Sequence, residues 1–151
     1  MSSFNPIIFN PTCVVEQGVA GYISASFSGS IYCYQGNSNS DKTSLPAVVV
    51  SCKDAQEVYF NTRNYAFDVD IMVIESAADD TAINFSNICG NVVSLFTDSS
   101  MGVGALQAYL AANAVPLSIY QIQINRFAEG ESGDMWVNTF NFKMIGALVP
   151  R

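Results

Sequence analysis

Residues 45–80, LPAVVVSCKDAQEVYFNTRNYAFDVDIMVIESAADD, constrain the fold of this 151-residue chain more than any other stretch. Residues 47–52 form a continuous run rich in β-branched side chains, which is typical of a buried β-strand. In residues 65–74 apolar side chains recur at every second position, which predicts another strand. Asp79, Asp80 and Thr81 then supply a helix cap and acidic groups that favour the positive end of a helix dipole. The stretch therefore predicts two strands that lead into a helix.

The predicted strand over residues 65–74 has two different faces. One face is apolar throughout and consists of Tyr65, Phe67, Val69, Ile71 and Val73. The other face changes along the strand, because Asp68 and Asp70 give way to Met72 and Ile74. We expect the first face to lie in the core. On the second face, we expect Asp68 and Asp70 to contact water or the aqueous lumen of a ring. Met72 and Ile74 should make a second apolar contact.

A helix is predicted over residues 11–26. Asn10 is a favourable cap residue, and Pro11 suits a first helical position because its ring fixes the backbone angle that a helix needs. Gly18 and Gly21 weaken such a helix by about 1 kcal/mol each relative to alanine. We therefore expect these two glycines to mark a close approach of the helix to another element.

The remaining segments predict three more strands and one more helix. A short strand over residues 31–34 precedes a polar, turn-rich loop over residues 35–44. The helix after Thr81 carries an apolar stripe, Phe85, Ile88, Cys89, Val92, Leu95 and Phe96. A shorter helix carries Leu106, Tyr109 and Leu110 and is stopped by Asn113 and Pro116. Closing strands over residues 117–124 and 135–145 are joined through a polar turn at 129–134.

This order of elements predicts an α+β fold, because strands adjacent in sequence usually pair with one another. We expect a mainly antiparallel sheet with two to three helices packed on one face, in one domain over residues 11–146. Residues 1–10 would form an N-terminal arm and residues 147–151 a C-terminal tail. The last four residues, LVPR, match what thrombin leaves after removal of a C-terminal tag, or they are native. The sequence shows neither a signal peptide nor a membrane span.

The charge content is low for a chain of this size. Charged residues make up 13% of the chain, about half the usual share of roughly 25%, whereas apolar residues make up 50%. Either Ser and Asn cover the surface, or other subunits cover much of it, and we prefer the second interpretation because obligate interfaces are poor in charge. The formal net charge of −7 argues against a grip on nucleic acid, which needs clustered Lys and Arg. The same charge would suit a surface that DNA passes without sticking, and it is also an ordinary aid to solubility.

Catalysis and metal chemistry have little support in the sequence. The chain has no histidine, and Cys13, Cys33, Cys52 and Cys89 are widely spaced, so neither a mixed zinc site nor a Ser-His or Cys-His nucleophile is available. Apolar neighbours indicate buried, reduced thiols, with a Cys33–Cys52 bridge as the main exception. We expect no enzyme activity and no cofactor.

Asp68 and Asp70 are the best candidates for a polar site. Their carboxylates share one strand face roughly 7 Å apart and could hold a hard cation together with Glu75 or Asp134. A solvated strand face, or the lumen of a ring, explains them better, because two carboxylates without histidine make a poor transition-metal site. We therefore predict that Asp68 and Asp70 face water or a lumen and bind no metal.

Five residues are candidates for contacts between subunits. Arg63 and Arg126 lie beside predicted strand ends, where a guanidinium could reach carboxylates of a neighbour, although simple solvation is the alternative. Trp136 shares one face of the last strand with Phe140 and Phe142; it belongs either to the core or to an interface. Asp41 and Lys42 are the charges of the 35–44 loop, which we expect to act as a contact arm.

The order of these segments resembles a family of virus proteins. The sequence LPAVVVSCKDAQEV is followed by TRNYAFDVDIMVIESAADDT, then by a light helix, LSIYQIQINRFAEG and an alternating last strand. Within it, the spacing of Asn64, Tyr65, Val69, Ile71, Val73, Ala78, Asp79 and Asp80 carries the likeness. Over residues 11–146 the chain resembles the tail-terminator and related neck or tail-completion proteins of long-tailed bacteriophages. The two glycines of the first helix and the 35–44 loop depart from that pattern.

The resemblance implies a structural role in a virion assembled in the host cytoplasm. It implies a ring, usually of six copies, that caps the tail tube, stops its polymerisation and joins it to the head connector or stopper protein. DNA would cross the central hole without specific binding, and no membrane would be involved. Two alternatives stay open. One is another part of the neck or tail, such as a head-completion or tube-like protein, and the other is a monomeric α+β domain that binds a small molecule.

Overall fold

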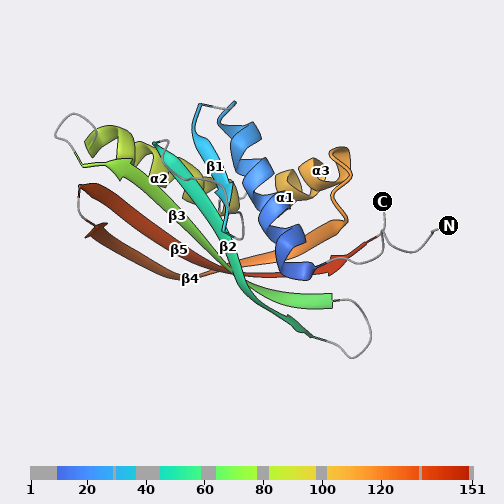
Figure 1. The fold of residues 1–151 in the computed structure, drawn as a ribbon. Helices are drawn as coiled ribbons and strands as arrows, with labels where there is room; N and C mark the ends of the chain where they lie inside the picture. The colour runs from blue at the N-terminus through green and yellow to red at the C-terminus, as the bar shows by residue number, and fades with distance from the viewer. Residues whose placement is uncertain are drawn as a thin grey trace.

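The computed structural model describes residues 10–28, 30–36, 45–58, 64–77, 82–97, 102–132 and 134–149. Eight elements follow one another: α1 (Pro11–Ser26), β1 (Tyr32–Gln35), β2 (Ala47–Glu57), β3 (Asn64–Ser76), α2 (Ala82–Thr97), α3 (Gly102–Ala112), β4 (Leu117–Ser132) and β5 (Met135–Leu148). Figure 1 shows the helices gathered on one side of the sheet. The predicted α+β class and the predicted order of elements are therefore confirmed.

The sheet has five strands in the order β1-β2-β3-β5-β4. The pairs β2–β3, β3–β5 and β4–β5 are antiparallel, whereas β1 and β2 are parallel. Two details differ from the expectation that neighbours in sequence pair in an antiparallel way. The first pair is parallel, and β3 pairs with β5 because the β4–β5 hairpin joins the sheet with β5 inside. As a result β4 forms one edge of the sheet.

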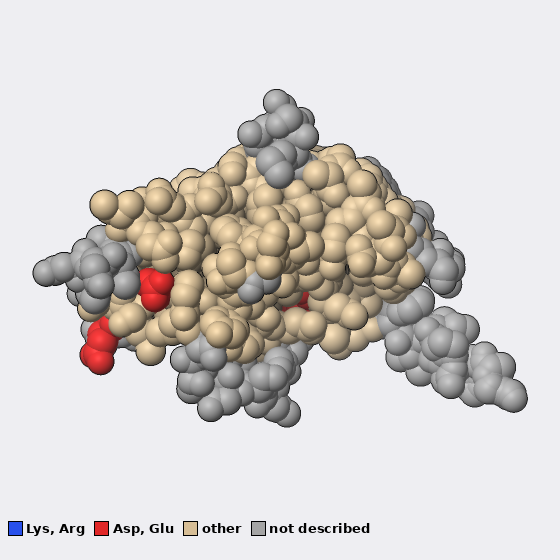
Figure 2. All heavy atoms as spheres, turned by 90° about the horizontal axis from the view of Figure 1, so that it is seen from above, with Lys and Arg blue, Asp and Glu red and all other residues tan. Residues whose placement is uncertain are grey.

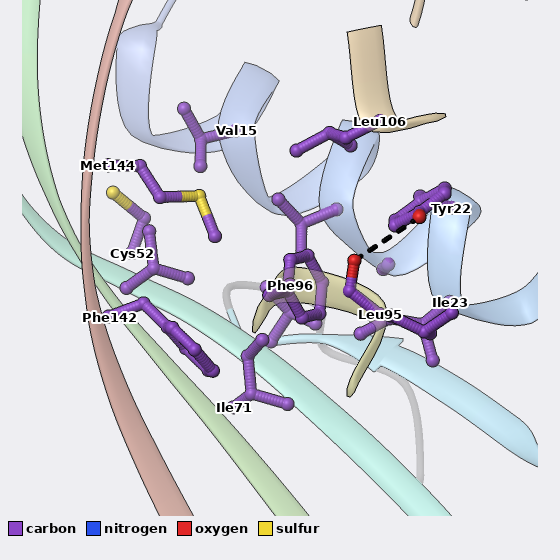
Figure 3. Close-up of a cluster of buried hydrophobic side chains, with 14 of the residues drawn as sticks. Val15, Tyr22, Ile23, Cys52, Ile71, Leu95, Phe96, Leu106, Phe142 and Met144 are labelled. Atoms are coloured by element: carbon purple, nitrogen blue, oxygen red, sulfur yellow. Dashed lines mark hydrogen bonds between the residues drawn. The ribbon is translucent and has the colours of Figure 1, made fainter. Parts of the chain in front are cut away.

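The apolar face of β3 lies against the helices, as predicted. Phe67, Val69, Ile71 and Val73 are completely buried, while Tyr65 at the start of the strand is half-buried. Phe96 of α2 packs on Phe142 of β5 with ring centroids 5.3 Å apart. Figure 3 shows Ile71, Phe96, Phe142, Met144 and Val15 converging in this core between the sheet and the helices. Burial of these side chains is the main force that holds the helices on the sheet.

Helix α1 begins and packs as the sequence predicts. The side chain of Asn10 accepts hydrogen bonds from the Thr12 amide at 3.2 Å and the Thr12 hydroxyl at 2.8 Å, which caps the first turn. A Cβ added to Gly18 would lie 2.8 Å from Leu110 Cδ2, and one added to Gly21 would collide with the Tyr109 hydroxyl. Both glycines therefore allow α1 to approach α3.

Several predicted boundaries are too short. Strand β2 continues past Cys52 to Glu57, and β4 continues past Ile124 to Ser132, so most of the predicted 129–134 turn belongs to the strand. Residues 147 and 148, assigned to a tail, are the last residues of β5, and Leu148 is buried. Arg126 consequently lies within β4 and not beside a strand end.

The charged residue Glu16 lies inside the core, which the sequence did not indicate. It is fully buried, and its Oε2 accepts a hydrogen bond from the Cys52 amide at 2.8 Å. The pairing of β2 with β3 shifts by one residue directly after Cys52, which leaves Lys53 as a bulge. Glu16 thus gives a hydrogen-bond partner to the backbone beside this bulge and fastens α1 to β2.

Some predictions fall on residues outside the described ranges. These are residues 1–9 of the N-terminal arm, Asp79 and Asp80, and the candidate contact residues Asp41, Lys42 and Arg63. Their expected roles remain predictions.

Candidate functional site

A polar cluster occupies the middle of the sheet face that points away from the helices. The strand register sets Arg126 of β4 beside Asn141 of β5, and Asn141 beside Asp70 of β3. Asp68 lies in the next outward-facing position of β3, with Lys143 beside it on β5. Asp68 is exposed and Asp70 is half-buried. Both carboxylates therefore lie on the open face of the sheet, as the alternation predicts.

Asn141 is the centre of this cluster. Its Nδ2 donates to Asp68 Oδ1 and to Asp70 Oδ1, each at 2.6 Å, and its Oδ1 accepts from Asn125 Nδ2 at 2.9 Å. The amide thereby bridges two carboxylates that would repel each other if they stood alone. These hydrogen bonds hold both aspartates in place.

Lys53 completes the cluster from the bulge of β2. Its Nζ lies 2.8 Å from Asp70 Oδ2, and this carboxylate raises the pKa of Lys53 through its hydrogen bond and its charge. The side chains enclose a shallow hollow of about 450 Å³, also lined by Arg126 and Thr139. Two acids and two bases line this hollow, so its charge is balanced although the chain as a whole is acidic.

The alternative interpretation of Asp68 and Asp70 as a cation site offered Glu75 or Asp134 as an extra ligand. Glu75 is buried on the opposite face of β3, where its carboxylate accepts hydrogen bonds from the Ser76 amide and from Asn84. Asp134 lies in the turn before β5, where its carbonyl accepts from the Ala77 amide at 2.6 Å. Neither residue reaches Asp68 and Asp70. In the described part of the chain no three His, Cys, Asp or Glu residues come together in a way that could hold a metal ion.

The open face becomes apolar toward the end of β3. Met72 and Ile74 are half-buried there, beside Thr139 and Val137 of β5 and Val49 of β2. This change along the strand is the one that the sequence predicts.

Trp136, a candidate interface residue, lies on the other face of the sheet. It is half-buried, with its ring 5.8 Å from that of Phe85 in α2. Its aromatic contact in this structure is therefore with the helix layer of its own chain.

The helix layer presents an almost uncharged surface. The 16 residues of α1, the 16 of α2 and the 11 of α3 include one charged residue, Glu16, and that residue is buried. Exposed positions carry Ser, Asn, Gly and Ala, together with Gln17, Thr97 and Ile83, of which Ile83 is 76% exposed. Figure 2, which views the molecule from above, shows no Lys or Arg and few acidic side chains among the described residues. A surface so poor in charge is typical of one that is covered in an assembly.

A second hollow lies between α1, β1 and α3. It has a volume of about 700 Å³ and is lined by Cys13, Gln17, Cys33, Tyr109 and Asn113, among others.

Burial raises the pKa of Cys33 to about 11 and that of Cys52, in the core, to about 12. All four cysteines are free thiols, so the alternative Cys33–Cys52 bridge is not formed. Thiols with such pKa values are poor nucleophiles at neutral pH.

Sequence reasoning identified Asp68, Asp70 and Arg126 but missed Asn141 and Lys53. Asparagine and lysine on a strand carry no distinctive signal by themselves, and their place beside the aspartates depends on the strand register. The absence of charge from the helix layer was visible in the sequence once the helices were placed, because the three predicted helices already contained one acidic residue and no basic one.

The comparisons with known proteins show a likeness in fold. No family model matches the chain, and no curated protein matches it. A chain in a solved structure of the virion of a native gene transfer agent (GTA) particle matches with a TM-score of 0.52 and 15% sequence identity. The match covers 97% of this chain and 99% of that chain.

In the described residues, no helix is both long and apolar enough to cross a membrane.

Proposed function

We propose that this chain is a structural protein of a phage-like virion. More closely, we propose a tail terminator, which forms a ring at the head–tail interface, ends the tail tube and lets DNA pass. The observation that carries the proposal is the likeness in fold to a chain of a gene transfer agent virion, which extends over almost the whole of both chains. The role is one of assembly and not of catalysis.

Two features of the surface support an assembly role. The helix layer exposes Ser, Asn, Ala and Gly without charge, as expected of a face that meets other proteins. The open sheet face holds Asp68 and Asp70 in a hydrogen-bonded cluster that includes Lys53 and Arg126 in its lining. A face with balanced charges offers no continuous basic track for phosphates, so DNA could slide past it. The proposed partners are further copies of the chain, the tail-tube protein and the head connector or stopper protein.

Native mass spectrometry of the purified protein at tens of micromolar tests the ring. We expect a closed oligomer, with six as the expected number of copies, and electron microscopy should show a central hole. A monomer that also fails to assemble when mixed with tail-tube protein would contradict the proposal.

The position in the particle needs a separate experiment. Particles from the natural source, labelled with an antibody against this chain and viewed by electron microscopy, should carry the label at the head–tail junction. Label along the whole tail would instead indicate a tube-like protein, which is the nearest alternative. A small-molecule role would be favoured if the protein stayed monomeric and a ligand bound in the hollow lined by Cys13, Cys33 and Tyr109.

A further inference from the structure

Strand β4 is a long and poorly protected edge of the sheet. It forms this edge over 16 residues, and no described strand pairs with its outer side. Three of its large apolar side chains are well exposed: Tyr120 at 47%, Ile124 at 36% and Phe127 at 53%. Natural edge strands are usually short or carry lysines and prolines that prevent pairing with another chain. Within residues 117–128 the one charged residue is Arg126, and there is no proline.

Among the described residues, a strand covers only part of the opposite edge. Strand β1 pairs with the first four residues of β2, Ala47 to Val50. The following seven residues of β2, from Ser51 to Glu57, have no described strand on that side. This part of β2, Ser51 to Glu57, contains Lys53, Asp54 and Glu57. Lys53 already pairs with Asp70 of its own chain, whereas the side chain of Asp54 is exposed.

The directions of the two edge strands fit each other. Because β2, β3, β5 and β4 alternate in direction across the sheet, β2 and β4 run antiparallel to each other. A second copy turned the same way and placed beside β4 would therefore present its β2 in the antiparallel sense. Such a contact joins two different surfaces, so repetition produces a closed ring when the rotation closes.

The charges of the two edges are complementary on the open face. Arg126 lies in the same cross-strand row as Asn141 and Asp70, and Asp54 lies in the neighbouring row, beside Asp68. All these residues point to the side of the sheet away from the helices. Side chains in neighbouring rows of paired strands are diagonal neighbours, which a long arginine side chain can span. A guanidinium at one edge would thus meet a carboxylate at the other.

We propose that the outer edge of β4 in one copy pairs with residues Ser51 to Glu57 of β2 in the next copy, with Arg126 facing Asp54. This inference rests on the proposed ring and names the surface that builds it. On the helix side, the exposed Ile124 and Phe127 would be covered by the neighbour's chain around Ala55, which faces the helices in the same way.

Charge reversal tests the pairing. Arg126→Asp and Asp54→Arg should each weaken assembly at least tenfold, measured as the protein concentration at which half of the copies are assembled in sedimentation velocity. The control is Lys143→Asp, which makes the same charge change on the same face, next to Asp68, but on an interior strand. This variant should assemble like the parent, and circular dichroism should show that all three variants are folded.

Mixing the two edge variants gives the sharper result. An equimolar mixture should assemble again. The β4 edge of the Arg126→Asp variant can pair with the β2 edge of the Asp54→Arg variant, so that opposite charges face each other. The β4 edge of the Asp54→Arg variant, with its unchanged Arg126, can pair with the unchanged Asp54 of the Arg126→Asp variant. Native mass spectrometry should find rings that contain equal numbers of the two variants. If the parent forms rings and neither variant weakens them, the β4–β2 pairing is wrong while the ring stands. If the parent forms no ring at all, the proposed function fails and this inference fails with it.

Discussion

The two faces of the sheet are held in place by different forces. On the helix side, Phe67, Val69, Ile71 and Phe142 are completely buried, and their side chains are apolar. On the open side, Asp68, Asp70 and their partners form hydrogen bonds and an ion pair at the surface. The first face provides most of the stability, since burial of apolar area dominates folding and exposed ion pairs contribute little. The second face is therefore free to serve contacts outside the chain.

The largest effect should come from a change on the buried face. Ile71→Ala removes a fully buried side chain and should lower the free energy of unfolding by about 2–5 kcal/mol. The control is Met72→Ala, one residue away on the open face, which should cost about 1 kcal/mol or less because Met72 is only half-buried. Urea unfolding followed by circular dichroism measures both. Equal losses for the two variants would contradict the contrast between the faces.

The next prediction concerns Glu16, the one charged side chain of helices α1, α2 and α3. Glu16→Ala leaves the Cys52 amide without its acceptor beside the β2 bulge, which should cost about 1–3 kcal/mol. Glu16→Gln keeps a carbonyl oxygen at that position and should cost clearly less. Urea unfolding of the two variants gives the comparison. A glutamine variant as unstable as the alanine variant would show that the hydrogen bond to Cys52 is not what Glu16 contributes.

The smallest effect should come from the ion pair on the open face. Lys53→Met removes the partner of Asp70 at a lysine whose side chain is 67% exposed. The loss in stability should be below about 1 kcal/mol and should shrink as salt is added, because exposed pairs are screened. Urea unfolding at low and high sodium chloride checks this, with Ile71→Ala as the salt-independent reference. A loss of several kcal/mol would mean that the open face also stabilises the fold.

The sequence predicted the elements well and placed the ends of several strands too early. The predicted ends at residues 52 and 124 come immediately before the bulges at Lys53 and Asn125. At both places polar residues follow the apolar run, Lys53 and Asp54 in β2 and Asn125 and Arg126 in β4, so the pattern of a buried strand stops although the pairing continues beyond the bulge. The parallel β1–β2 pair and the β3–β5 pairing depend on contacts between distant segments, which periodicity does not report.

The candidate site was predicted in part for a related reason. Asp68 and Asp70 stood out because they interrupt an apolar pattern, and their position on the open face follows from alternation alone. Asn141 and Lys53 join them only through the register of β3 with β5 and the bulge of β2. The hydrogen bonds from Asn141 to the two aspartates join residues 73 and 71 positions apart, and such distant contacts leave no mark in a local pattern.

The raised pKa values of Cys33 and Cys52 have a practical consequence for handling the protein. With a pKa of about 11, roughly one Cys33 thiol in ten thousand is ionised at pH 7, and still fewer Cys52 thiols are. Oxidants attack the ionised form, so these two sulfurs should resist oxidation in air. These two thiols should therefore stay reduced in air-saturated buffer without an added reductant.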